Sequence, residues 1–116
     1  MKTIGLIGGM SSESTISYYQ LINQIVNDKF GKLHSAKMVI ASVDFEEIES
    51  LQNNGNWEAA GKLLAYEAKK LENAHCDFVI LATNTMHKIA SQIESAISIP
   101  FLHIADCVAK ELVEHN

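Results

Sequence analysis

Three small hydrogen-bonding side chains stand together at the end of an apolar run. The run is Phe78 to Ala82, and Thr83, Asn84 and Thr85 follow it directly, with His87 just beyond them. Hydroxyl and amide groups of this kind can bind a small polar ligand through several hydrogen bonds. They are also common helix caps and turn residues, so these residues alone leave a ligand site and a simple turn equally open.

A glycine-rich loop follows the first apolar run of the chain. It reads GGMSSES from Gly8 to Ser14 and stands where a helical pattern begins. Unpaired backbone N–H groups at the start of a helix favour an anionic ligand, as does the helix dipole. The loop matches neither the dinucleotide pattern GxGxxG nor the phosphate-binding pattern GxxxxGK[ST]. A small acid held by backbone donors is the ligand that this chemistry favours.

Apolar runs and helical patterns alternate along the chain. We expect strands at Thr3 to Gly8, Met38 to Asp44, Phe78 to Ala82 and Phe101 to Ala105. These runs are almost continuously apolar, which is typical of a parallel sheet covered on both faces. The alternation predicts an α/β fold in one domain, a flavodoxin-like doubly wound sheet of four parallel strands in the order 2-1-3-4.

The predicted elements begin and end at recognisable residues. Asn56, Thr85 and Asp106 are expected N-caps of the second, third and last helices, and Pro100 follows the third helix. In a doubly wound sheet, ligands bind beyond the carboxyl ends of the strands where the strand order reverses. With the order 2-1-3-4 this point lies between strands one and three, so the two polar loops are expected to converge in one crevice.

Composition excludes several classes of function. The 116 residues are 47% hydrophobic and 20% charged, which suits one globular domain, and the formal charge of −5 argues against a nucleic-acid partner. The N-terminal apolar run stops at Gly8, too short for a signal segment or a membrane span, so we expect a cytoplasmic chain with no membrane partner. Cys76 and Cys107 form no zinc or disulfide pattern, and the five histidines lack metal-binding spacing, so no metal site is expected.

Three separate motifs carry a more specific resemblance. They are Gly8 to Thr15; Ser42 to Phe45 with Ile48, Gln52, Gly55 and Trp57; and Thr83 to Lys88. Together they resemble the aspartate/glutamate racemase family, and most closely its broad-specificity amino-acid racemase subgroup. The likeness runs from Met1 to about Asp106.

The resemblance implies a racemase that uses no cofactor and is built from two similar α/β domains facing each other across a cleft. Such an enzyme needs one acid/base group on each side of the substrate α-carbon, and in the family both are usually cysteines. Here Thr83 stands at the place of the first cysteine. Because a hydroxyl is a far weaker acid than a thiol, Thr83 either relays or donates a proton, with unequal handling of the two enantiomers, or only binds substrate.

Binding roles also carry over from the family. Asn84 and Thr85 are expected to hold the α-carboxylate of an amino acid, Met10 to shape the pocket, and Gln52, on the loop after the second strand, to contact the distal part of the substrate. The alternatives are core filling for Met10 and a solvated loop residue for Gln52. His87 is a further candidate for a substrate contact.

The chain ends about where the first domain of the family ends. Residues 1–116 are therefore expected to form an N-terminal racemase domain that lacks its second domain and is inactive alone. A homodimer through this domain is also expected, with Tyr18, Tyr19 and Phe30 as candidate contacts. Two rival readings are a non-catalytic module that binds a small carboxylate or associates with itself, and a flavodoxin-like phosphate binder.

Overall fold

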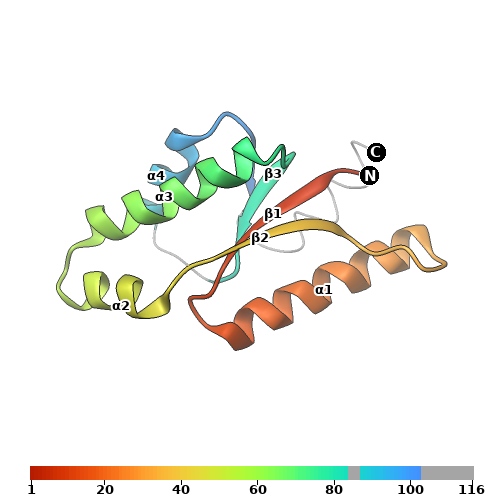
Figure 1. Cartoon of the computed structure of the whole chain (residues 1–116), viewed down its shortest axis with the longest axis horizontal. Helices are drawn as coiled ribbons and strands as arrows, with labels where there is room; N and C mark the ends of the chain where they lie inside the picture. The colour runs from red at the N-terminus through yellow and green to blue at the C-terminus, as the bar shows by residue number, and fades with distance from the viewer. Residues whose placement is uncertain (84–86, 103–116) are drawn as a thin grey trace.

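A computed structural model of the chain describes residues 1–83 and 87–102 (Figure 1). In chain order its elements are β1 (Thr3–Gly8), α1 (Ser12–Phe30), β2 (Lys37–Ser42), α2 (Phe45–Asn53), α3 (Trp57–Asn73), β3 (Phe78–Leu81), α4 (His87–Ala96) and β4 (Phe101–Leu102). The four strands form one parallel sheet in the order β2-β1-β3-β4. The predicted fold class and strand order are confirmed.

Two apolar clusters cover the two faces of the sheet because side chains alternate along each strand. Leu6 of β1 packs with Ile22 and Val26 of α1. On the other face, Ile7 packs with residues of α3 and α4, among them Leu64. Figure 1 shows the same arrangement, with α1 on one side of the sheet and α3 and α4 on the other. The expectation of a sheet covered on both faces holds for β1 and β3.

The edge strand β2 departs from that expectation. Val39 is 37% exposed and Ile40 is 41% exposed, although the run looks as apolar as the central strands. The reason is position, since β2 pairs only with β1 within the described sheet. A continuous apolar run therefore did not indicate a strand buried on both faces here.

A helix that the sequence analysis did not predict follows β2. The second strand was expected to reach Asp44, but β2 ends at Ser42 and Asp44 is the N-cap of α2, its carboxylate accepting a hydrogen bond from the Glu46 N–H at 3.1 Å. Gln52 consequently lies on a helix and not on a loop, which corrects the earlier placement. The segment was missed because α2 has nine residues and one buried side chain, Ile48, too little to show helical periodicity.

Other ends of helices and strands lie closer to the positions predicted from the sequence. Asn56 caps α3 as predicted, its side chain accepting from the Ala59 N–H at 3.3 Å. The third strand ends at Leu81, one residue before the expected Ala82. The predicted caps Thr85 and Asp106, and the fourth strand beyond residue 102, lie outside the described residues. Among the helices that the structure describes, none combines the length and the apolar character needed to span a bilayer.

Candidate functional site

A small cavity lies beyond the carboxyl ends of three neighbouring strands. Its volume is about 150 Å³, and it is lined by Met10, Phe45, Ile48, Gln52 and Thr83. Met10 follows β1, Thr83 follows β3, and the other three residues belong to the helix after β2. The structure thus brings together three residues that were predicted as site residues from separate parts of the sequence.

Helix α2 supplies most of the cavity wall. Phe45, Ile48 and Gln52 are spaced i, i+3 and i+7, so they share one face of the helix. Ile48 is 1% exposed and anchors α2 in the core, whereas Phe45 is 41% exposed. Sequence reasoning missed Phe45 and Ile48 as lining residues. Their spacing, directly after the capping residue Asp44, is the signal that could have found them.

Met10 serves the core and the cavity together. Its side chain is 6% exposed and belongs to the apolar cluster that contains Ile7, Ile48 and Leu81, and it also lines the cavity. The two interpretations of Met10 from sequence, core filling and pocket wall, are therefore compatible. Its contact with substrate stays a prediction.

Thr83 sits where the chain turns away from the sheet. The Ala82 N–H still donates to the Ile7 carbonyl at 2.9 Å, and the chain bends at Ala82 and Thr83. This geometry directs the half-buried Thr83 into the lining of the cavity beside Met10. Asn84 and Thr85, the predicted carboxylate ligands, lie outside the described residues.

The described lining has no charged side chain. Three members are apolar, Gln52 offers an amide and Thr83 offers a hydroxyl. These two groups can donate and accept hydrogen bonds, so the cavity suits a small molecule with both polar and apolar parts. Neither group is an efficient base near neutral pH, because an amide does not titrate and a hydroxyl is a very weak acid.

Two backbone N–H groups of the first loop are already hydrogen-bonded. The Gly9 N–H donates to the hydroxyl of Thr15 at 2.9 Å. Ser11 caps α1, its hydroxyl accepting from the Ser14 N–H at 3.3 Å. The expectation of a loop with free donors is therefore wrong for these two N–H groups.

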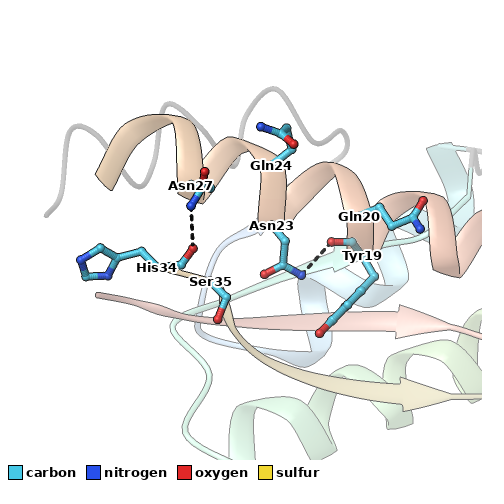
Figure 2. Close-up of a pocket in the computed structure, with 7 residues that line it drawn as sticks. All are labelled: Tyr19, Gln20, Asn23, Gln24, Asn27, His34 and Ser35. Carbon is cyan, nitrogen blue, oxygen red and sulfur yellow. Dashed lines mark hydrogen bonds between the residues drawn. The ribbon is translucent and has the colours of Figure 1, made fainter. Parts of the chain in front are cut away.

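A larger surface hollow, of about 470 Å³, lies along α1 and the connection to β2 (Figure 2). Two of its amides hold that connection: Asn23 accepts from the Ala36 N–H at 2.8 Å, and Asn27 donates to the carbonyls of Lys32 at 3.0 Å and His34 at 3.4 Å. The hollow stands near the amino end of β2, opposite the end where the predicted residues meet. These two amides thus hold the connection before β2 in place, and the smaller cavity remains the candidate site.

The other chemistry-bearing side chains that the structure describes are not among those lining the cavity. Cys76 is buried before β3, and burial together with the charge of Asp77 raises the pKa of its thiol, so it is an unreactive packed cysteine. Cys107 and the His87 side chain are outside the described part of the structure. Within residues 1–83 and 87–102 there is no group of three His, Cys, Asp or Glu side chains arranged to hold a metal ion.

Comparison with known proteins places this architecture. Residues 7–116 match the family model for Asp/Glu/Hydantoin racemase. The chain is 26% identical over 122 residues to the broad-specificity amino-acid racemase RacX of Bacillus subtilis strain 168, an alignment that covers 94% of this chain and 48% of RacX.

Two solved structures are similar to the fold over nearly its whole length. A crystal structure of an Asp/Glu racemase candidate from Yersinia pestis has a TM-score of 0.86 and 51% identity, and covers 99% of this chain and 50% of its own. An aspartate racemase homologue from Pyrococcus horikoshii OT3 has a TM-score of 0.80 and 35% identity, and covers 100% of this chain and 50% of its own. The chain spans about half the length of these relatives. Since the family model covers nearly all of its residues, the chain belongs to the Asp/Glu/Hydantoin racemase family.

Proposed function

We propose that this chain is the N-terminal half of an amino-acid racemase of aspartate/glutamate type that uses no cofactor. One observation supports this most strongly: Met10, Gln52 and Thr83 meet in one cavity at the carboxyl ends of the strands in a member of the racemase family. The cavity has a volume of about 150 Å³. A volume of this order suits part of a small amino acid.

The proposed chemistry is proton transfer at the α-carbon by two groups on opposite sides of the substrate. Thr83 is the group of this half, acting as a proton donor or relay. In one direction the opposite group takes the α-proton while the Thr83 hydroxyl gives a proton to the other face of the carbon and regains one from water. In the reverse direction Thr83 would have to accept the α-proton, which a neutral hydroxyl does poorly, so the two directions are unequal. That second group belongs to a second, homologous domain, and residues 1–116 alone would therefore be inactive.

The substrate is held by polar groups around the cavity. Asn84 and Thr85 bind the α-carboxylate, Gln52 contacts the distal part of the side chain, and Met10 closes the apolar wall. The described cavity supports the roles of Gln52 and Met10 by placing both in its lining. No metal or organic cofactor takes part in this proposal.

The protein is further proposed to act in the cytoplasm as a homodimer through this domain. Two of the aromatic side chains predicted as contacts are available for it, since Tyr19 is 47% exposed and Phe30 is 38% exposed. Tyr18 packs against the apolar cluster beneath α1, so it is a weaker candidate than its neighbour. Sedimentation equilibrium of the wild type and of a Tyr19→Ser variant would test this contact.

Loss of the α-proton signal in heavy water tests the enzymatic proposal. The natural gene product and residues 1–116 are each incubated with L- and D-amino acids, and proton NMR follows the α-proton. Exchange with at least one amino acid by the gene product, faster from one enantiomer, and none by residues 1–116, is the expected result. Absence of exchange across the whole panel by the gene product would refute the proposal.

A second candidate is a non-catalytic module that binds a small carboxylate or associates with itself. The observation that favours it is the lack of an efficient base in the described lining, where a hydroxyl and an amide are the polar groups. It predicts that aspartate binds and raises the melting temperature while no α-proton exchanges. Stabilisation by phosphate but not by aspartate would instead indicate a phosphate binder.

A further inference from the structure

Gly8, the last residue of β1, and Gly9, the first residue of the loop to α1, both stand where an added side chain would meet close neighbours. A Cβ on Gly8 would lie 2.7 Å from Cγ2 and 2.8 Å from Oγ1 of Thr15. A Cβ on Gly9, where φ is +94°, would overlap the carbonyl oxygen of Val43. The Val43 N–H also donates to the Gly8 carbonyl at 2.8 Å. The loop is thus packed closely between the first turns of α1 and the chain that follows β2.

The hydroxyl of Thr15 forms two hydrogen bonds within this loop. It accepts from the Gly9 N–H at 2.9 Å and donates to the Ser11 carbonyl at 3.1 Å. One hydroxyl therefore uses both its donor and its acceptor capacity on the backbone. The two bonded residues stand immediately before and immediately after Met10.

This arrangement fixes the backbone on both sides of a cavity-lining residue. Met10 is 6% exposed and lines the cavity together with Gln52. Without the hydroxyl, the Gly9 N–H loses its partner in a half-buried place, whereas the Ser11 carbonyl keeps the hydrogen bond from the Thr15 N–H at 3.0 Å. The link through one side chain between the residues before and after Met10 is then lost. The position of the Met10 side chain would then be less well defined.

We propose that Thr15 is a positioning residue of the site: its hydroxyl holds Met10 in the cavity wall and withdraws the Gly9 N–H from any ligand. The claim that the Thr15 hydroxyl holds Met10 in place needs only the geometry of the loop. The effect on substrate rests on the proposed function of the cavity as an amino-acid site. Thr15 itself is not among the lining residues, so it acts through Met10 and not by direct contact.

Two matched substitutions separate the hydroxyl of Thr15 from its shape. Thr15→Val keeps the branched side chain and removes the hydroxyl, whereas Thr15→Ser keeps the hydroxyl and removes the methyl group. Ser95→Ala is the control, because Ser95 on α4 makes the same kind of bond, to the Ser91 carbonyl at 2.9 Å, away from the cavity lining. The natural gene product is the protein tested, with L-aspartate as the probe.

The first measurement is the NMR position of the Met10 methyl group and the Gly9 amide without ligand. The chemical shifts of both groups should change in Thr15→Val and remain unchanged in Thr15→Ser and Ser95→Ala. Unchanged signals in the valine variant, or equal shifts in the serine variant, would overturn the proposal. Should the valine variant not fold, hydrogen exchange in the wild type decides, since a Gly9 amide that exchanges as fast as a solvated one contradicts the bond to Thr15.

The second measurement is the kinetics of α-proton exchange. Thr15→Val should raise the KM for L-aspartate on the order of tenfold, with kcat within about threefold, because a displaced wall weakens binding of ground state and transition state alike. An unchanged KM would contradict the effect on substrate. If the wild-type gene product exchanges no amino acid, the proposed function fails, and the Met10 and Gly9 signals still decide whether Thr15 positions the loop.

Discussion

Replacing Gly9 by alanine tests the tight loop on which the cavity depends. Gly9 has a φ of +94°, and an added Cβ would lie 2.7 Å from the Val43 nitrogen and 2.7 Å from the Ser42 hydroxyl, besides overlapping the Val43 carbonyl. Two contributions therefore lower the stability of a Gly9→Ala variant. The positive φ costs about 1–3 kcal/mol for a residue other than glycine, and the forced displacement of the chain after β2 costs about 1–3 kcal/mol more.

Gly31 provides a matched control for the first of these costs. Its φ is +73°, and nothing lies within 4 Å of the place where a Cβ would be added. Gly31→Ala should therefore lower the free energy of unfolding by the conformational contribution alone, about 1–3 kcal/mol. Gly9→Ala should lower it by about 2–6 kcal/mol in total. Urea unfolding of both variants and the wild type measures the difference.

The result that would refute the reasoning is a Gly9→Ala variant no less stable than Gly31→Ala. Such a result would mean that the loop and the chain after β2 are not in contact as described, and the wall of the cavity beside Met10 would lose its support. A larger loss for Gly9→Ala, together with weaker binding of L-aspartate, agrees with the account.

Three further predictions concern the site and one surface contact. Thr83→Ala should slow α-proton exchange by about 100-fold or more, as expected for loss of an acid/base group, while Thr83→Ser keeps most activity; equal rates in both variants would leave Thr83 no chemical role. Gln52→Ala should raise KM on the order of tenfold with little change in kcat, as expected for one lost hydrogen bond, and steady-state kinetics checks this. The Glu72 carboxylate accepts hydrogen bonds from Lys69 and from the hydroxyl and N–H of Ser98, which lower its pKa from 4.5 to about 2. Because the folded pKa is depressed, this contribution to stability is present above pH 4.5 and is lost as the pH falls toward 2. Ser98→Ala should therefore destabilise the protein at pH 7 and much less near pH 2, and urea unfolding at both values measures it; an equal loss at both would contradict the contact.

The sheet could be predicted from the sequence because the central strands are buried on both faces and their residues are therefore apolar. The runs of β1 and β3 are apolar on both faces, and the rules for parallel α/β sheets leave few strand orders, of which the flavodoxin-like 2-1-3-4 was the one expected. The same rules predicted that the loops carrying Met10 and Thr83 would meet, since both follow neighbouring strands. Their meeting in one cavity was thus a consequence of topology.

The second strand and the helix after it show where sequence reasoning fails. An apolar run does not reveal how many neighbours its strand has, so the exposure of Val39 and Ile40 could not be predicted. Helix α2 is stabilised by one buried residue, Ile48, and by its cap Asp44, features that a search for longer periodic patterns overlooks. Gln52 was identified by resemblance but assigned to a loop, and Phe45 was missed as a wall residue for the same reason.

Titration of the isotope-labelled gene product with L-aspartate, followed by NMR, is the most direct measurement of the central claim. We expect chemical-shift changes at the Met10 methyl, the Gln52 side-chain amide and the Thr83 methyl, with the amides of Asn23 and Asn27 in the larger hollow unchanged. Shifts confined to Asn23 and Asn27, or signals of the cavity that stay in place at saturating L-aspartate and with every other amino acid tried, would contradict it.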